Sequence, residues 1–239
     1  MKQQSLELRV KSSEKTYSQL RMSLFFLVFT LLITHYSSLS TASAAGNGSQ
    51  ERLTEIVEGI QKKLAGIKDI QGNFTQNSYI KDLDQKQKYT GAFFIMKPAK
   101  VMWEYSSPRD EKVLIRKTDT RIYKKSQNQL IKMKFSKEAY NQVPIALLES
   151  LENIWKDFDA SLTDANTLQL IPKRKRGSIK TIVLETASDD FPLKMFTIFD
   201  IYGNIVMIEL DNLKINSGLD DSLFVIKTPP DVEVFDMSE

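Results

Sequence analysis

Short segments in which apolar and polar residues alternate run through most of the chain from residue 70 onward, and this pattern constrains the fold most. Successive side chains of a β-strand point to opposite faces, so strict alternation marks a strand with one buried face. In residues 101–105, Val101, Trp103 and Tyr105 fall on one face. Polar, turn-length stretches separate the segments at regular intervals, which is typical of an antiparallel meander, sandwich or barrel. We therefore expect a mainly β fold.

The alternation accounts for most of the chain beyond residue 70. The expected strands are 70–76, 89–96, 101–105, 112–116, 121–125, 129–135, 160–162, 167–171, 179–186, 193–199, 205–210 and 223–226. The Pro229-Pro230 pair is expected to end the regular structure, because proline cannot donate a backbone hydrogen bond.

Two segments instead follow the helical spacing of three and four residues. The first begins near Ser49, a residue type that caps helix N-termini, and ends at Gly66 or Gly72. The second covers 143–158, with Pro144 near its first turn. Their apolar stripes are Leu53, Ile56, Val57, Ile60, Leu64 and Ile67 in the first, and Leu147, Leu148, Leu151, Ile154, Trp155 and Phe158 in the second. These helices must cover the sheet or close its open end, because its apolar face needs a partner.

The start of the chain has the pattern of a secretory signal. Residues 24–33 are apolar apart from Thr30, basic residues precede them, and the small residues 42–45 follow. This apolar run is too short for a stable membrane span, which takes about 20 residues. We expect cleavage after Ala44 or Ala45, with Met22 as an alternative start and an uncleaved anchor as the competing interpretation. The expected domains are a cleaved signal peptide, 1–45, and one domain, 46–239, that is soluble after export.

The net charge of +3 arises within the signal region. Its charged residues are Lys2, Arg9, Lys11, Lys15 and Arg21 against Glu7 and Glu14. The remaining chain is neutral, so electrostatics gives no reason to expect nucleic acid or an anionic membrane as a partner. The one basic run, 173–176, is interpreted as the exposed loop of a hairpin in which Gly177 makes the turn. Binding of phosphate or of a membrane surface is the alternative.

The sequence lacks the residues that most enzymes and metal sites need. It has no Cys, and its one histidine, His35, lies in the signal region. The expected mature protein therefore has neither a nucleophile–histidine pair nor the usual zinc ligands, and no glycine-rich phosphate loop occurs. Carboxylate chemistry at Asp189-Asp190 or Asp220-Asp221 is the remaining enzymatic alternative, although turns commonly contain Asp. We expect a protein that is not an enzyme, with no catalytic residue, metal or cofactor.

An ordered series of motifs adds a family resemblance. Residues 91–105 read Gly-Ala-Phe-Phe-Ile-Met-Lys-Pro-Ala-Lys-Val-Met-Trp-Glu-Tyr, and Pro108 follows. The C-terminal half continues with Pro192-Leu193, 200–204, Asn212, Asn216, Leu219-Asp220, Phe224 and 229–234. In order and spacing the series resembles the LolA family, the periplasmic outer-membrane lipoprotein carriers. The likeness covers essentially all of the expected mature chain.

The resemblance implies a half-open antiparallel β-barrel, capped by α-helices, that encloses an apolar cavity for the acyl chains of lipoproteins. Such a carrier takes acylated lipoproteins released by an inner-membrane ABC transporter and delivers them to an outer-membrane lipoprotein receptor; we expect a monomer. Burial of about 25 cal/mol per Å² of apolar surface would provide the affinity. The residues expected to line the cavity are Phe74, Phe93, Val101, Trp103, Tyr105, Leu147, Leu151 and Trp155.

The resemblance also gives Lys97 a role. It stands where the family usually has Arg, and a basic residue there would latch the helical lid by hydrogen bonds to its backbone carbonyls. Lysine offers a point donor instead of a planar fork. The alternative function is a lipid- or lipoprotein-binding sensor of the same fold that does not shuttle cargo. A receptor of the LolB type would need an acylated Cys, which this chain lacks.

Overall fold

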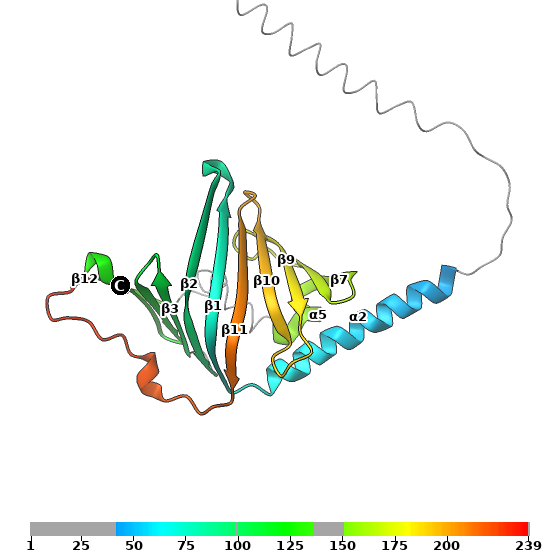
Figure 1. Ribbon diagram of the computed structural model, residues 1–239, viewed down its shortest axis with the longest axis horizontal. Helices are drawn as coiled ribbons and strands as arrows, with labels where there is room; N and C mark the ends of the chain where they lie inside the picture. The colour runs from blue at the N-terminus through cyan, green and yellow to red at the C-terminus, as the bar shows by residue number, and fades with distance from the viewer. Residues whose placement is uncertain (1–41, 99, 136–150, 239) are drawn as a thin grey trace, which may run out of the picture. The chain divides into compact units, whose positions relative to one another are not determined.

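The structure is a computed structural model of the 239-residue chain and describes residues 42–98, 100–135 and 151–238. One curved sheet and a long helix, α2 (Ala42–Ala65), make up most of it (Figure 1). The strands are β1 (Asp69–Ile80), β2 (Gln85–Met96), β3 (Lys100–Ser107), β4 (Glu111–Arg116), β5 (Asp119–Lys124), β6 (Gln129–Lys134), β7 (Phe158–Asp164), β8 (Thr167–Pro172), β9 (Ile179–Thr186), β10 (Leu193–Asp200), β11 (Ile205–Ile215) and β12 (Glu233–Met237). The short helical turns are η1 (Lys81–Leu83), η2 (Lys125–Gln127), η3 (Leu151–Asn153), α5 (Ile154–Asp157) and η4 (Asp221–Phe224).

All twelve strands form one sheet in the order β12-β6-β5-β4-β3-β2-β1-β11-β10-β9-β8-β7. The pairs are antiparallel except that β12 runs parallel to β6. Among the described residues β12 and β7 are the two edges and do not pair with each other, so the sheet is open. The expected half-open antiparallel barrel is therefore corrected to an open sheet with one parallel pair. The parallel pair arises because the chain crosses the sheet after β11 before it reaches β6.

The face of the sheet that α2 covers is called the inner face here. The apolar stripe expected on this helix is confirmed, because Val57, Ile60 and Leu64 are buried in one cluster with strand residues. Alternation along the strands places Phe74 of β1 and Phe93 of β2 in the same cluster. Burying one such side chain contributes about 1.5–3 kcal/mol relative to leaving it exposed. The helix and the inner face are thus held together mainly by apolar burial.

A second, smaller cluster lies on the opposite, outer face. Met102 of β3 and Leu114 of β4 are buried there together with Phe224 of η4. Their positions in the strands alternate with those of the inner-face residues, as the period of two requires. The segment after β11 therefore covers part of the outer face.

The C-terminal elements differ from the sequence-based expectation. Residues 223–226 do not form a strand, because Asp220 caps a helical turn by accepting a hydrogen bond from the Ser222 backbone N–H at 2.8 Å. The Pro229-Pro230 pair does not end the regular structure, since β12 follows it. All five residues of β12 are exposed, so its sequence carries no alternation of burial to predict it.

The helices differ as well. Helix α2 begins at Ala42 and not near Ser49, whereas its end at Ala65, just before Gly66, agrees with the prediction. The helix expected over 143–158 lies partly outside the described residues, and only η3 and α5 are helical in the rest. Phe158 has extended backbone angles and pairs with Pro172 as the first residue of β7, so its assignment to a helix was wrong.

Beside the turn between β4 and β5, the first residue of β5, Asp119, lies between two guanidinium groups. Asp119 accepts hydrogen bonds from Arg116 Nε at 2.9 Å and from Arg121 Nε at 2.8 Å. The bond from Arg116, opposed by partial burial and supported by Arg121 and Thr118, lowers the pKa of Asp119 from 3.8 to about 2. Because the folded pKa lies below the unfolded value, this stabilisation is present above about pH 4 and is lost as the pH falls toward 2.

Replacing Asp119 by asparagine is expected to lower the free energy of unfolding by about 1 kcal/mol at pH 7, a value reduced for solvent screening because the three side chains are 21–36% exposed. At pH 2 the difference from the wild type should largely vanish, because the wild-type carboxyl is then being protonated too. Urea denaturation of both proteins at the two pH values measures this. An equal difference in the free energy of unfolding at pH 7 and at pH 2 would contradict the charge-based explanation.

Candidate functional site

The inner face brings together most of the residues that were expected to line a cavity. Phe74, Phe93, Val101, Trp103 and Leu151 are buried in the inner cluster, and Tyr105 and Trp155 pack against it. Leu147 lies outside the described residues. In this structure the side chains pack on one another and on α2, as the members of one core.

Aromatic rings dominate the centre of the cluster. The Trp103 ring stacks on Phe74, with centroids 3.9 Å apart and planes at 23°, and on Phe93 at 5.6 Å and 25°. Tyr105 meets Phe74 edge-on at 5.4 Å. Such pairs contribute about 0.5–1.5 kcal/mol each beyond the area that they bury. The centre of the inner face is therefore a continuous apolar surface contributed by β1, β2 and β3.

Gly91 makes room for this aromatic stack. It pairs with Phe74 on β1 and with Tyr105 on β3. A Cβ atom at position 91 would lie 1.9 Å from the Glu104 carbonyl oxygen and 2.7 Å from the Phe74 ring. The backbone of β3 and the Phe74 ring thus occupy the space that any side chain would need.

We expect Gly91→Ala to lower the free energy of unfolding by about 1–3 kcal/mol, because the strand or the ring must shift to admit the methyl group. Gly59, in the middle of α2, has no atom within 4 Å of its would-be Cβ and serves as the matched control. Gly59→Ala should stabilise the protein by about 0.5–1 kcal/mol, as in any exposed helix interior. Thermal denaturation of the two variants checks this, and equal melting temperatures would contradict the close packing at Gly91.

Lys97 connects the end of α2 with η3. Its Nζ donates a hydrogen bond to the Leu64 carbonyl oxygen at 2.7 Å and forms an ion pair with Glu152. Leu64 is in the last turn of α2, where carbonyl groups lack helical partners and a cation is favoured. Gln61 adds a hydrogen bond from its Nε2 to the Glu152 carbonyl oxygen at 2.7 Å. Lys97 thus contacts a backbone carbonyl of α2, and its role as a latch stays a prediction.

The basic run 173–176 lies in the loop between β8 and β9, as predicted, and Gly177 there has a φ of +55°. Two of its residues have partners that the sequence did not indicate. Lys173 Nζ donates to the Trp155 carbonyl oxygen at 2.7 Å. Arg176 pairs with Asp157 at 2.6 Å, and its guanidinium lies 5.0 Å from the centroid of the Phe158 ring. These contacts therefore hold α5 against the loop between β8 and β9.

Polar groups lie next to the aromatic stack, further along β1, β2 and β3. Tyr105 donates a hydrogen bond from its hydroxyl to Gln76 Oε1 at 3.2 Å, and Arg109 donates to the Tyr89 hydroxyl at 3.1 Å. The Arg109 guanidinium carbon lies 4.5 Å from the Tyr89 ring centroid and 5.4 Å from that of Tyr105. Burial raises the pKa of Tyr105, and the neighbouring Trp103 indole N–H opposes this.

Sequence reasoning missed Gln76, Tyr89 and Arg109. The alternation contained a signal for Gln76, because it occupies the same phase as Phe74 in β1 and so had to face inward. Arg109 follows Pro108 in a turn, where nothing in the sequence indicates contact with two tyrosines.

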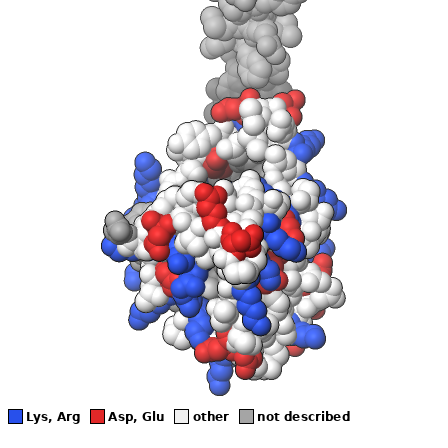
Figure 2. Space-filling view, turned by 90° about the vertical axis from the view of Figure 1, so that its left-hand side faces the viewer, with Lys and Arg blue, Asp and Glu red and all other residues white. Residues whose placement is uncertain are grey.

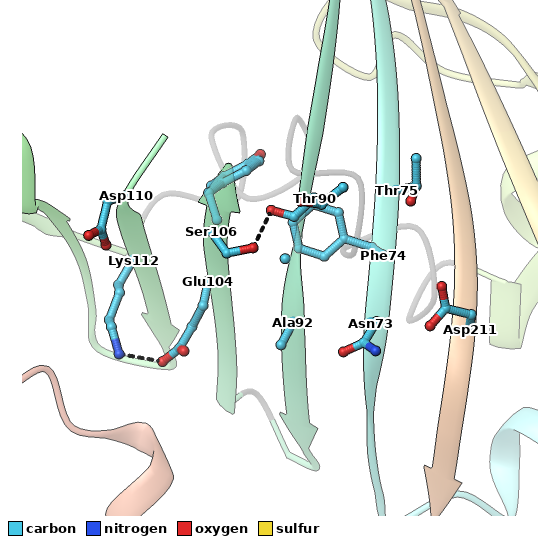
Figure 3. Close-up of a pocket in the computed structure, with 12 residues that line it drawn as sticks. Asn73, Phe74, Thr75, Thr90, Ala92, Glu104, Ser106, Asp110, Lys112 and Asp211 are labelled. Carbon is cyan, nitrogen blue, oxygen red and sulfur yellow. Dashed lines mark hydrogen bonds and ion pairs between the residues drawn. The ribbon is translucent and has the colours of Figure 1, made fainter. Parts of the chain in front are cut away.

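A pocket of about 600 Å³ crosses β11, β1, β2, β3 and β4 (Figure 3). Many of its lining residues alternate with those of the inner cluster and so belong to the outer face. Glu104 and Lys112 form an ion pair there at 2.8 Å. Further polar residues that line it are Asn73, Thr75, Thr90, Ser106, Asp110 and Asp211. This polar lining is unsuited to acyl chains.

Three of the four acidic residues considered for catalysis have structural contacts, Asp189 through its backbone only. The Asp189 carbonyl oxygen accepts a hydrogen bond from Lys63 at 2.5 Å. Asp220 caps η4, and Asp221 pairs with Lys100 at 2.5 Å. Among the described residues, no group of three or more His, Cys, Asp or Glu side chains could hold a metal ion.

The surface carries both signs of charge. Figure 2 shows Lys and Arg side chains interspersed with Asp and Glu on the face that it presents. This mixture agrees with the neutral balance of the chain after the signal region. In the part of the chain that the structure describes, no helix is long and apolar enough to cross a membrane.

The geometry defines a class of protein: one open, curved sheet with an apolar inner face against which an amphipathic helix packs (Figure 1). The family model described as "Outer membrane lipoprotein carrier protein LolA" matches residues 65–227. The chain therefore belongs to the LolA family, which confirms the resemblance seen in its motifs.

Curated relatives carry the same description. An outer-membrane lipoprotein carrier protein of Methylococcus capsulatus is 23% identical over 201 residues, which cover 82% of this chain and 91% of that protein. That of Shewanella loihica is 26% identical over 180 residues, with coverages of 74% and 84%. Among solved structures, an uncharacterized conserved protein from Thermus thermophilus has a TM-score of 0.49 at 14% identity, over 77% of this chain and 98% of that one.

Proposed function

We propose that the protein is a periplasmic carrier that binds the acyl chains of lipoproteins released from the inner membrane and delivers them to an outer-membrane receptor. The observation that carries the proposal is the apolar inner face, which packs in one cluster with α2, a helix held at its C-terminal end by polar contacts of Lys97. Family membership and the names of the relatives support it.

The proposed mechanism follows from two kinds of contact: the apolar packing of the inner face and the polar contacts of Lys97 with α2. Acyl chains have no directional groups, so an apolar, shape-tolerant surface is the appropriate receptor, and each buried CH₂ group contributes about 0.8 kcal/mol. The side chains of the inner cluster and of α2 form one packed core, so acyl chains would enter this proposed site by displacing α2. The cargo would then pack against the inner-face residues Phe74, Phe93, Val101 and Trp103. Release is the reverse exchange, which requires that the two states differ little in free energy.

The partners belong to the same proposal: acylated lipoproteins as cargo, an inner-membrane lipoprotein-releasing ABC transporter as donor and an outer-membrane lipoprotein receptor as acceptor. The test is to add the purified mature protein, a monomer in this proposal, to spheroplasts that retain newly made lipoproteins on their inner membrane. A soluble complex of the protein with lipoprotein is expected in the supernatant. Lipoproteins that stay on the membrane, with the protein alone in solution, would contradict the carrier function and favour a sensor that does not shuttle.

Export is expected to remove the signal peptide after Ala44 or Ala45, because the small residues 42–45 match the requirements of signal peptidase. The intact mass of the protein from a periplasmic extract measures the cleavage point. A chain that still begins at Met1 or Met22 and sediments with membranes would contradict this localisation.

A further inference from the structure

A buried donor stands unpaired at the edge of the aromatic stack. Trp103 is 2% exposed, and within the described chain no atom accepts a hydrogen bond from its Nε1. Buried N–H groups nearly always have a partner, because leaving one without an acceptor is unfavourable. An indole placed only to fill space could be a phenylalanine, as at position 93 in the same cluster. The indole N–H group therefore lacks an acceptor among the described residues, and a bound ligand is one source of such an acceptor.

The indole N–H lies beside the polar groups of the inner face. The Trp103 and Tyr105 rings meet edge-on with centroids 6.4 Å apart, and no hydrogen bond joins the indole N–H to the Tyr105 hydroxyl. The Tyr105 hydroxyl donates to Gln76, and the Arg109 guanidinium covers the Tyr105 ring at 5.4 Å. Trp103, Tyr105, Gln76 and Arg109 thus form one group, which we call the polar subsite.

Donors outnumber free acceptors in the polar subsite. A guanidinium has five N–H donors, and Arg109 uses one in its hydrogen bond to Tyr89, while its ion pair with Glu111 is loose at 3.9 Å. The Trp103 donor is unused. Gln76 Oε1 accepts one hydrogen bond from Tyr105 and has one lone pair left, fewer than the free donors of Arg109. A ligand group that suits this subsite is therefore one that only accepts hydrogen bonds.

Apolar residues lie directly beside the polar subsite on the same face. Gln76 pairs across the strands with Ile208 of β11, and the next inner position of that strand, Val206, pairs with Ile198 of β10. Ile208 is buried, and Val206 and Ile198 pack against the inner cluster. One part of the face thus offers hydrogen-bond donors and the adjoining part offers only hydrocarbon.

We propose that the polar subsite binds the carbonyl oxygens of the ester bonds that join acyl chains to the lipidated N-terminal residue of the cargo, an inference that rests on the proposed function. An ester carbonyl accepts hydrogen bonds and donates none, and it is attached to the chains that the apolar part would hold. The Trp103 indole N–H donates to this oxygen when α2 moves away. Arg109, at the exposed end of the polar subsite, contributes a second N–H donor. The site would then fix how far the acyl chains enter.

Two synthetic lipopeptides that differ only in this carbonyl test the proposal: one carries an ester-linked diacylglyceryl group, the other the ether-linked dialkylglyceryl group. Full-length mature protein is expected to bind the ester form about tenfold more tightly, the effect of one hydrogen bond to a buried donor. Trp103→Phe should abolish this preference. Phe74→Leu, which removes stacking surface but no donor, should weaken both complexes and keep the preference.

A measurement on the wild-type protein avoids any effect of substitution on folding. The protein has two tryptophans, so the indole ¹⁵N–H signals of Trp103 and Trp155 can be assigned and followed by NMR. The ester ligand should shift the Trp103 signal downfield and the ether ligand should not, with Trp155 as the internal reference. Palmitate is the third ligand, because its carboxylate also accepts hydrogen bonds.

The outcomes separate the inference from the function on which it rests. Equal affinity for the ester and ether forms, with an unchanged Trp103 signal, would overturn the subsite while leaving the carrier function intact. A Trp103 shift with palmitate alone would assign the subsite to free fatty acid carboxylates and overturn the ester assignment. Absence of binding to both lipopeptides would contradict the carrier function itself.

Discussion

Replacing Lys97 by leucine is expected to raise the apparent affinity for an acylated lipopeptide about tenfold and to slow its transfer to acceptor membranes by a similar factor. The substitution removes the hydrogen bond to the Leu64 carbonyl oxygen and the ion pair with Glu152. Hydrogen bonds of charged groups contribute about 1.5–3 kcal/mol, and we take the lower end because both side chains are about a third exposed. Since only the open form binds cargo in our proposal, a larger open population raises the apparent affinity and removes a driving force for release.

Two variants serve as controls for this prediction. Lys97→Arg should transfer cargo at close to the wild-type rate, because a guanidinium can make both contacts. Lys112→Leu removes another lysine in an ion pair, on the outer face, and should leave binding and transfer unchanged. Affinity is measured with a fluorescent lipopeptide, and transfer with outer-membrane vesicles. Wild-type affinity and transfer in Lys97→Leu would mean that Lys97 does not hold α2 closed.

Replacing Val101 by glutamate is expected to lower the free energy of unfolding by about 3–5 kcal/mol and to abolish lipopeptide binding. Val101 is 2% exposed and pairs across the strands with Ile95 and Ile115, all in the inner cluster or packed against it. A carboxylate has no cationic partner in such surroundings, and burying an unpaired charge costs several kcal/mol.

Loss of stability alone could also weaken binding, so a matched variant is needed. Leu114 is 1% exposed in the outer cluster, and Leu114→Ala should cost a similar amount, about 2–5 kcal/mol, without altering the inner face. At a temperature where both variants are folded by circular dichroism, Leu114→Ala should bind the lipopeptide and Val101→Glu should not. Normal binding by folded Val101→Glu would show that cargo does not contact this part of the inner face.

The strands were predictable because their burial follows the period of two. The expected 179–186 strand agrees with β9 (Ile179–Thr186) at both ends, since Ile182 and Leu184 are buried in alternation with more exposed neighbours. β12 was not predictable, because none of its residues is buried and its pairing partner β6 lies far earlier in the chain. The open edges of the sheet likewise depend on which strands meet in space, which local patterns do not encode.

Part of the candidate site was predictable, because the alternation of apolar and polar residues along a strand decides which side chains are buried. Val101 and Trp103 face inward because the strand alternates, and their neighbours across β2 and β4 follow. The contact of Lys97 with α2 came from the family resemblance and not from the local sequence, which would make it a solvated lysine. The contacts of Arg109 and Arg176 with aromatic rings were missed, because the turns that carry them give no sign of their partners.

The account rests on acyl chains as the ligand, and one binding measurement tests this most directly. The mature protein is mixed with a triacylated lipopeptide or with the same peptide lacking its acyl chains, and the complexes are counted by native mass spectrometry. The account predicts a complex of one protein with one acylated peptide and none with the unacylated peptide. Equal binding of both peptides, or no complex with the acylated one, would contradict it.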